Sequence, residues 1–328
     1  MNDQDATRLP EQFVERLRRI MSAEQYESAL RSFAAAPVTT FRVNTLLAGI
    51  EPVLASLRDE GIDPQPAGWY DEAFWVPQDR RDDLLTSSAA ESRHIYIQNL
   101  SSMLPPLVLA PEPGERVLDL TAAPGSKTLQ LASLMNGEGE LAAVEIVRAR
   151  FFKMKALLDE YGASFVRTFL QNGERVWRYR PEHFDRVMLD APCSTEGRFQ
   201  TIDPATYAYW SPRKIKEMAS KQRRLLFSAV HSLQPGGVLV YSTCTFAPEE
   251  NEAMIDWALT KFGDALEIDD IHMDIPRGAP ALSEWNGSRF APGLSRAVRI
   301  LPDEQFEGFF VCRLRKTEST LRGPVAPR

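Results

Sequence analysis

Residues 118–128 read LDLTAAPGSKT, and this stretch decides which fold the rest of the sequence supports. An apolar run that favours a strand ends at Leu120, a Pro-Gly turn follows, and a helix-favouring segment begins at Ser126. Small residues at a strand-to-helix turn let backbone N–H groups approach a ligand at the carboxyl end of the strand. The stretch is not a GxGxxG fingerprint, and its GSKT lacks the upstream glycine of a phosphate-binding loop. It therefore predicts a ligand-binding turn without a pyrophosphate loop.

Strand-like and helix-like segments alternate outward from this turn. The predicted strands are 116–120, 140–145, 165–170, 185–190 and 238–242, with final strands near 265–269 and 308–314. The predicted helices between them are 126–135, 148–161, 212–233 and 249–262. Such alternation is typical of a parallel sheet with helices on both faces. We therefore expect an α/β fold with a doubly wound, mostly parallel, Rossmann-like sheet.

The first hundred residues have a different pattern. Apolar residues from Phe13 to Met21 recur at helical spacing, and Ser22 with Gln25 forms a capping-box pattern for a second helix. Short apolar stretches then alternate with turns around one helix-like segment at 52–60, which is typical of a small α+β domain. The expected organisation is a helical segment at 1–37, a small α+β domain at 38–104, an α/β domain at 105–316 and a flexible tail at 317–328.

The charge balance is uneven along the chain. The 328 residues carry 45 acidic and 38 basic side chains, a net charge of -7, which by itself argues against nucleic-acid binding. Residues 148–224, however, hold 16 Lys and Arg against 9 Asp and Glu, whereas the remainder holds 22 against 36. Net charge does not describe local patches, so a basic segment within an acidic protein keeps an RNA partner open.

Cysteine content and hydropathy exclude several classes of protein. The three cysteines, Cys193, Cys244 and Cys312, are too few and too scattered for a disulfide framework, and the four histidines are far apart in sequence. Apolar runs are much shorter than the 18 or more residues of a membrane span, and the polar start MNDQDATRLP does not resemble a signal peptide. We expect a cytoplasmic monomer with no metal site and no membrane contact.

An acidic residue closes the second predicted strand. Glu145 follows Gly125 by 20 residues, and a carboxylate at that position can accept hydrogen bonds from both hydroxyls of a ribose. A ribose-binding acid beside a turn that lacks a pyrophosphate loop suits a nucleoside cofactor without phosphates, for which S-adenosylmethionine is the candidate. A packing turn with Glu145 as a solvated strand end remains the alternative.

Two cysteines follow two neighbouring strands. Cys193 lies in DAPC after the fourth strand and Cys244 in STC after the fifth, and these strand ends flank the same crevice of a doubly wound sheet. A single free cysteine is most often a small buried hydrophobe, which we expect of Cys312 in FFVCRL. The positions of Cys193 and Cys244 predict that the two thiols meet near the methyl donor.

A thiol pair beside a methyl donor suggests a specific chemistry. Carbon 5 of cytosine is a poor nucleophile, but a thiolate that adds to carbon 6 converts the ring to an enamine that can take a methyl group. An acid must hold or protonate N3 during the addition, and Asp190, three residues before Cys193, is the candidate. A base must then remove the C5 proton so that the thiolate is expelled.

With these residues assembled, the sequence resembles the Nop/Sun family of RNA cytosine-5 methyltransferases, and is most similar to the bacterial 16S ribosomal RNA enzymes. The matching blocks are FRVNTL at 41–46, YIQNLSSMLP at 96–105, AAPGSKT at 122–128, DAPCS at 190–194, YSTCT at 241–245, EENE at 249–252 and EGFFVCRLRK at 307–316. The resemblance implies a class I methyltransferase fold and methyl transfer from S-adenosylmethionine to cytosine in RNA through a covalent cysteine–C6 adduct.

The resemblance also implies roles for individual residues. Cys244 would be the nucleophile, Cys193 would assist product release, and Asp190 with Lys127 beside it would bind the cytosine. That base must leave any stack to reach the thiolate. The expected cofactor residues are Ala122, Ala123, Pro124, Gly125, Ser126, Lys127, Glu145, Arg150, Asn172 and Asp190.

Two features depart from the family pattern. Asn172 stands where relatives usually have Asp, so it can accept a hydrogen bond from the adenine amino group only without charge, which puts cofactor affinity in doubt. Many relatives carry a C-terminal RNA-binding domain, whereas this sequence ends at 328. RNA recognition is therefore expected from residues 1–100 and the basic segment. The candidate RNA contacts are Arg42, Asn44, Arg198 and Lys221.

Ribosomal RNA is the favoured substrate, and three alternatives remain. A tRNA cytosine-5 methyltransferase would use the same chemistry. An inactive RNA-binding ribosome assembly factor is kept open by Asn172, although the intact Cys193, Cys244, Asp190 and Lys127 argue against it. A small-molecule methyltransferase would need no cysteine pair.

Overall fold

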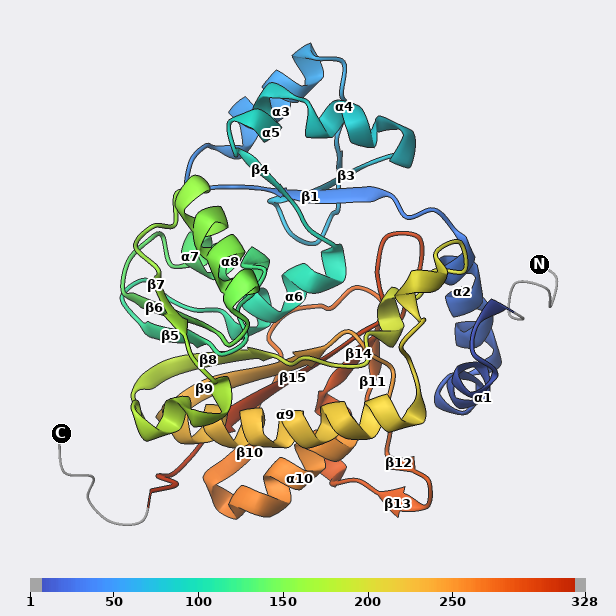
Figure 1. The fold of residues 1–328 in the computed structure, drawn as a ribbon, viewed down its shortest axis with the longest axis vertical. Helices are drawn as coiled ribbons and strands as arrows, with labels where there is room; N and C mark the ends of the chain where they lie inside the picture. Colours follow the sequence, from blue (N-terminus) through green and yellow to red (C-terminus); the bar gives the residue numbers. More distant parts are fainter. Residues whose placement is uncertain (1–7, 322–328) are drawn as a thin grey trace.

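The computed structural model describes residues 8–321, and its largest element is a mixed sheet of nine strands (Figure 1). Five parallel strands lie at one side, in the order β9 (Leu233–Thr243), β8 (Phe184–Asp190), β5 (Arg116–Asp119), β6 (Glu140–Glu145) and β7 (Arg167–Leu170). The sheet continues beyond β9 with antiparallel strands, which are β15 (Phe309–Lys316), β14 (Val298–Ile300), β11 (Gly278–Pro280) and β10 (Leu266–Ile268). The predicted fold class is confirmed.

Helices cover both faces of this sheet, so it is doubly wound, as expected (Figure 1). One face packs against α6 (Leu100–Leu109), α7 (Ser126–Leu134) and α8 (Arg148–Glu160), and the other against α9 (Pro212–Ser232) and α10 (Glu252–Phe262). Side chains alternate along each strand. In β5, Val117 therefore joins the first core and Leu118 the second.

A small antiparallel sheet with its own core lies at the top of Figure 1. Its strands, in order, are β2 (Gln65–Pro66), β3 (Ala73–Val76), β1 (Thr39–Val43) and β4 (Ile95–Ile97). Its helices are α3 (Ile50–Asp59), α4 (Arg81–Leu85) and α5 (Ser88–Glu91). Apolar side chains from α3 and β1, including Leu57 and Phe41, fill the space between helix and sheet.

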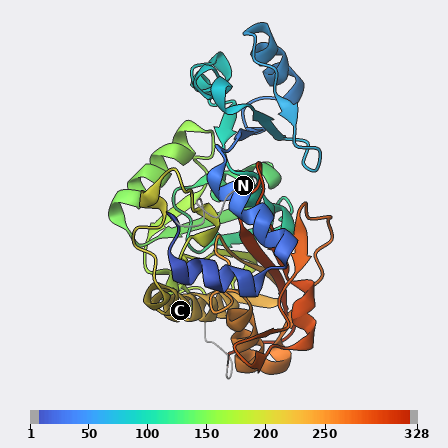
Figure 2. The same cartoon turned by 90° about the vertical axis from the view of Figure 1, so that its right-hand side faces the viewer.

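The two N-terminal helices, α1 (Glu11–Ile20) and α2 (Ala23–Ala34), pack on the large domain rather than on the small sheet (Figure 2). The predicted capping box is present, with Ser22 accepting from the backbone N–H of Gln25 at 3.3 Å. Phe13 and Phe33 pack against Phe199 and Phe246, which follow the two cysteine motifs. The N-terminal helices therefore cover the loops that carry the two predicted catalytic cysteines.

Some elements differ from the sequence-based expectation. Helix α6 was not predicted because Pro105 and Pro106 lie inside it, and the expected boundary between 104 and 105 falls within this helix. The region between 278 and 300 was not assigned strands, since its elements are only two or three residues long. They include a hairpin of β12 (Glu284–Trp285) with β13 (Ser288–Arg289).

The predicted flexible tail at 317–328 is partly described. The backbone N–H of Thr317 donates to the carbonyl of Ala265 at 3.1 Å, and that of Thr320 donates to Glu182 at 2.9 Å, so residues 317–321 are held against the domain. Residues 322–328, like residues 1–7 of the predicted helical segment, lie outside the described residues. Among residues 8–321, no helix combines the length and hydropathy that crossing a bilayer requires.

Candidate active site

A cleft of about 400 Å³ opens at the carboxyl ends of the parallel strands. It is bounded by the turn after β5, the ends of β6 and β8, the loop after β9 and residues 96–102, which lead from β4 into α6. Of the predicted cofactor residues, those that line the cleft are Ala123, Pro124, Ser126, Lys127, Glu145, Arg150, Asn172 and Asp190. The structure thus brings together side chains from segments that lie far apart in the sequence, from Tyr96 to Phe309.

Two of the predicted cofactor residues, Ala122 and Gly125, do not line the cleft, whereas their neighbours Ala123, Pro124 and Ser126 do. The backbone N–H of Ala122 donates to the carbonyl of Val144 at 2.9 Å, and that of Gly125 donates to Ala122 at 2.8 Å. Gly125 has a φ of +110°, and a Cβ there would lie 3.2 Å from Cγ of Met154 on α8. Both residues shape the turn. Gly125 fits there because it has no Cβ, so it can adopt a positive φ and lie close to α8.

Glu145 is buried, which rules out the solvated strand end. One carboxylate oxygen accepts from the backbone N–H of Val147 at 2.6 Å, and the other lies 3.4 Å from Nη1 of Arg150. The next side chain, Ile146, is 50% exposed and borders the cleft, as does that of Val147. A fixed carboxylate beside uncovered apolar side chains fits the ribose and the base of S-adenosylmethionine.

Asn172 lines the same cleft and also begins a short 3₁₀ helix. Its side-chain oxygen accepts from the backbone N–H of Glu174 at 3.0 Å. A carbonyl oxygen has two lone pairs, so this capping bond leaves one of them for a further donor. The substitution of Asp by Asn therefore keeps an acceptor in place but supplies no charge.

Asp190 and Lys127 form an ion pair inside the cleft. Nζ of Lys127 lies 2.7 Å from Oδ2 of Asp190 and donates to the hydroxyl of Ser102 at 2.6 Å. The other carboxylate oxygen of Asp190 accepts from the hydroxyl of Ser242 at 2.9 Å. The pair is thus fixed by residues from α6 and from β9, and it lines the same cleft as the two cysteines.

The two predicted thiols meet. Sγ of Cys193 lies 3.3 Å from Sγ of Cys244, both cysteines are free, and both line the cleft. The adjacent Cys244 sulfur and burial raise the pKa of the Cys193 thiol well above its usual value. Cys312, in contrast, is fully buried on β15, as expected of a small core residue.

Several cleft residues were missed by the sequence reasoning. Ser102, Glu307 and Phe309 line the site, and burial raises the pKa of the Glu307 carboxyl. Nε of Arg198 lies 3.4 Å from Oε2 of Glu307. These residues belong to the family blocks at 96–105 and 307–316, but nothing local in those blocks shows that they reach the cysteines, because α6 and β15 approach the site only in the folded chain.

The prediction that Arg42 and Asn44 contact RNA is corrected by their burial. Both side chains are 0% exposed. Nε of Arg42 donates to Gln98 at 3.1 Å, and Nδ2 of Asn44 donates to the carbonyls of Arg93 and Tyr161, each at 3.0 Å. They join the small domain to the large one. Arg198 and Lys221 do border the cleft, so they remain candidate RNA contacts.

The fold and the site together define a class of protein. A parallel sheet of this order, a turn without a phosphate loop and a buried acid at the end of the second strand belong to Rossmann-like class I methyltransferases. Within that class, the chain belongs to the family described as 16S rRNA methyltransferase RsmB/F, whose model matches residues 106–315. A second model, described as the ferredoxin-like domain of RsmF/B-like methyltransferases, matches residues 9–80.

Individual relatives agree with this assignment. The Ribosomal RNA small subunit methyltransferase F proteins of Cronobacter sakazakii and Escherichia coli O7:K1 are each 38% identical, over 95% and 97% of this chain. The chain spans only 64% and 65% of their lengths. The predicted family resemblance and the prediction of S-adenosylmethionine as cofactor are both confirmed.

Solved structures share the fold over nearly the whole chain. A methyltransferase homolog protein from Pyrococcus horikoshii is 30% identical, with a TM-score of 0.82 over 96% of this chain and 100% of that one. NSun6 from the same organism, solved with SFG, has a TM-score of 0.79 over 94% of this chain and 98% of that one. Its 21% identity makes it a likeness of fold alone.

Proposed function

We propose that this chain transfers a methyl group from S-adenosylmethionine to carbon 5 of cytosine in RNA, and that its substrate is 16S ribosomal RNA. The observation that carries the proposal is the 3.3 Å separation of the Cys193 and Cys244 sulfurs beside the Lys127–Asp190 pair, in a cleft that fits the cofactor. The names of the relatives support ribosomal RNA as the substrate.

The cofactor side of the cleft has a clear division of tasks. Glu145 accepts the ribose hydroxyls, the exposed side chains of Ile146 and Val147 cover the base, and Asn172 accepts from its amino group. S-adenosylmethionine supplies the methyl group. Arg150 closes this side, with Nη2 donating to the carbonyl of Ala123 in the turn.

The substrate side is arranged for covalent catalysis. Cys244 attacks carbon 6 of the cytosine, forming an S–C6 bond, while Asp190 and Lys127 hold the N3 edge of the ring. After methyl transfer, loss of the C5 proton to a base regenerates the double bond and expels the Cys244 thiolate. Cys193 assists this second half, and its sulfur lies 3.3 Å from that of Cys244.

The electrostatics of the pair support this division of roles. The thiolate is the nucleophilic form of cysteine. The neighbouring Cys244 sulfur and burial raise the pKa of Cys193 well above its usual value, so Cys193 is kept in the thiol form, which is not the attacking one.

Two cysteine variants test the mechanism. Cys244→Ala should abolish methyl transfer, whereas Cys193→Ala should accumulate a covalent RNA–protein adduct because elimination stalls. Denaturing gel electrophoresis with labelled RNA measures the adduct. Accumulation in Cys244→Ala instead would reverse the two roles.

The substrate is tested by bisulfite sequencing of ribosomal RNA and tRNA from a strain that lacks the gene. Loss of a mark in 16S ribosomal RNA is expected, and loss in tRNA alone would make the chain a tRNA methyltransferase. Calorimetry with S-adenosylmethionine tests the inactive assembly factor, because a failure to bind the cofactor would favour that function over catalysis.

A further inference from the structure

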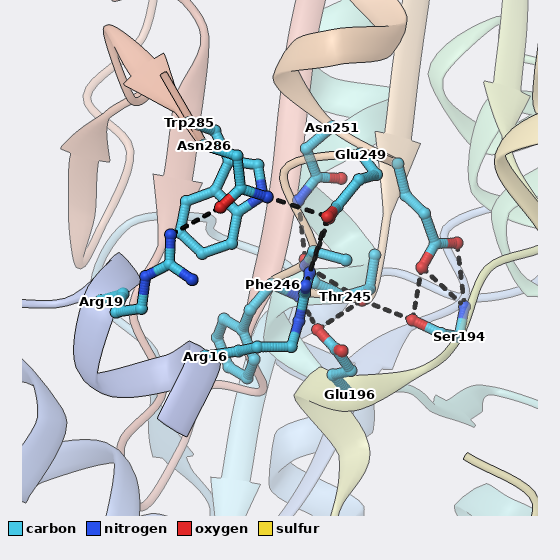
Figure 3. A network of polar contacts seen from close by, with 12 residues as sticks. Arg16, Arg19, Ser194, Glu196, Thr245, Phe246, Glu249, Asn251, Trp285 and Asn286 are labelled. Carbon is cyan, nitrogen blue, oxygen red and sulfur yellow. Dashed lines mark hydrogen bonds and ion pairs between the residues drawn. The ribbon is translucent and has the colours of Figure 1, made fainter. Parts of the chain in front are cut away.

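The residues that directly follow the two cysteines are joined inside the protein (Figure 3). Ser194 and Thr245 are 6% and 1% exposed, and their hydroxyl oxygens are 2.8 Å apart. Neither side chain borders the cleft. This contact ties the loop after β8 to the loop after β9, immediately behind the two thiols.

Two glutamates hold this junction in a reciprocal way. Glu250, from the segment after Cys244, accepts from the backbone N–H of Ser194 at 3.0 Å and also bonds the Ser194 hydroxyl. Glu196, from the segment after Cys193, accepts from the hydroxyl of Thr245 at 2.9 Å and from the backbone N–H of Phe246 at 3.0 Å. Each cysteine loop is therefore held by a carboxyl group that the other loop supplies.

Neighbouring donors fix both carboxyl groups. Nε2 of Gln222 donates to Glu250 at 2.8 Å and to the carbonyl of Pro192 at 2.9 Å, so it holds the chain just before Cys193. Nε1 of Trp210 donates to Glu196 at 2.8 Å. Both glutamates are almost completely buried, at 0% exposed for Glu250 and 1% for Glu196.

The hydrogens in this chain of contacts can be counted. The contacts Glu250–Ser194, Ser194–Thr245 and Thr245–Glu196 need three hydrogens, and the two hydroxyls supply one each. With both carboxyls ionised, one of the three contacts would bring two oxygens together without a hydrogen between them. The third hydrogen must therefore be a carboxyl proton.

The surroundings place that proton on Glu250. Oε1 of Glu196 faces the Trp210 N–H, and its Oε2 faces both the Thr245 hydroxyl and the Phe246 N–H, so each oxygen already accepts from a nitrogen. In Glu250, the two nitrogen donors within 3.0 Å go to Oε2, which leaves Oε1 to the Ser194 hydroxyl. Burial raises the pKa of Glu250 to about 8 and also raises the pKa of Glu196, so the pattern of nitrogen donors is what distinguishes the two carboxyls.

We propose that Glu196 and Glu250 form a clasp that shares one proton, and that this clasp fixes the two thiols at the separation the reaction needs. The proposal rests on the proposed function. It makes both glutamates, with Ser194 and Thr245, positioning residues. The other charged or titratable groups around the clasp are the Arg16–Glu249 ion pair, the thiol of Cys193 and the hydroxyl of Tyr241.

Oxidation of the thiol pair tests the clasp without any methylation assay. Diamide oxidises two thiols to a disulfide and is itself reduced, so the rate of Cys193–Cys244 disulfide formation, followed by mass spectrometry at pH 7, reports how often the sulfurs meet. Glu250→Gln can donate to Ser194 and still accept from Gln222, so it should retain the rate to within about twofold. Glu250→Ala should slow it by about tenfold, because buried donors lose their acceptor.

The matching change at the other carboxyl should behave differently. In Glu196→Gln, the NH₂ group replaces one of two oxygens that each accept from an N–H group, so two donors face each other whichever way the amide is turned. This variant should therefore slow disulfide formation by about tenfold. Glu217→Gln is the control, since this exposed carboxyl on α9 pairs with Lys214 and takes no part in the clasp. Equal rates in every variant would overturn the clasp, and a slow Glu250→Gln with a fast Glu196→Gln would overturn the placement of the proton. Circular dichroism of each variant separates misfolding from a local effect.

Methylation gives a second readout that a purely structural role would not produce. Glu196→Gln should lower kcat rather than raise KM, and a larger fraction of the protein should be trapped as the RNA adduct. If Cys193→Ala and Cys244→Ala show no adduct chemistry, the proposed function fails, but the disulfide rates still decide whether the clasp exists.

Discussion

Glu145 ends β6 and Asp190 ends β8, the two strands that flank β5, and the two carboxylates have different surroundings. Glu145 is 5% exposed and takes a backbone N–H, which fixes the carboxylate for a neutral partner such as a ribose. Asp190 shares its charge with Lys127 and opens to the cleft beside the thiols. The two carboxylates thus have different partners at the two strand ends, which supports the different roles that we propose for them.

His231 provides a pH prediction at the scale of a residue. Its ring packs against Phe227 with centroids 4.3 Å apart, and Nδ1 lies 2.8 Å from the hydroxyl of Thr320. Burial lowers the pKa of His231 from 6.5 to about 4. The unfolded chain therefore binds a proton more readily, so the stability present above pH 6.5 is lost as the pH falls toward 4.

Replacement of this ring should flatten the acid side of the stability curve. When the pH is lowered from 7 to 5, the free energy of unfolding should decrease in both proteins. The decrease should be smaller in His231→Phe than in the unaltered protein, by about 1 to 2 kcal/mol. Urea denaturation at the two pH values measures the difference. The exposed His272, changed to Gln, is the control. An unchanged pH dependence in His231→Phe would assign the acid sensitivity to other groups.

At the scale of an element, helix α1 braces the loop that carries Cys244. Arg16 makes two hydrogen bonds to Glu249, at 2.6 and 3.2 Å, and Nε1 of Trp285 donates to the same carboxylate at 3.0 Å (Figure 3). The guanidinium groups of Arg16 and Arg19 lie 5.3 and 4.5 Å from the Trp285 ring. Segments 233 residues apart are thus joined directly beside the catalytic loop.

A double-mutant cycle measures this brace. Arg16→Ala and Glu249→Ala should each destabilise the protein, and their coupling should be about 1 kcal/mol, because the pair is two-pronged and only partly exposed. Hydrogen exchange should increase in α1 and in residues 244–251. If the destabilisations of the two single variants add up to that of the double variant, the coupling is zero and the ion pair does not stabilise the protein.

At the scale of the whole molecule, the small domain is fastened to the large one by buried polar contacts. Asn44 donates to carbonyls of Arg93, in the small domain, and Tyr161, which follows α8. Nη2 of Arg93 also lies 3.2 Å from Glu160. The upstream family block therefore orients the two domains, and it does so from inside the structure.

This assignment separates stability from RNA binding. Asn44→Ala should lower the free energy of unfolding by about 1 to 3 kcal/mol, because two buried carbonyls lose their donor. Lys221→Ala should leave stability unchanged but weaken RNA binding and reduce its salt dependence by about one counterion. Urea denaturation and RNA titrations at several salt concentrations measure both. If Asn44→Ala instead weakened RNA binding without changing stability, Asn44 would be an RNA contact.

The basic segment at 148–224 shows how folding redistributes a local pattern. Its charges lie mainly on α8 and α9, and these helices pack on opposite faces of the large sheet. Of its lysines and arginines, Arg150, Arg198 and Lys221 border the cleft. A run of charge in the sequence is therefore not one patch, because the two helices that carry most of it lie on opposite sides of the sheet.

The sequence by itself determined the succession of the five parallel strands and of helices α7 to α10, the ligand turn, and the placement of Glu145, Asp190 and both cysteines at strand ends. Those features depend on periodicity and turn residues within short stretches of chain, and parallel strands necessarily present their carboxyl ends at one edge.

Only the tertiary structure decided that the sulfurs lie 3.3 Å apart, that α1 and α2 cover their loops, and that Arg42 and Asn44 are buried. The same holds for the reciprocal contacts of Glu196 and Glu250. The physical reason is that each of these features depends on how segments distant in sequence pack together, and no local pattern of residues encodes a contact between two such segments.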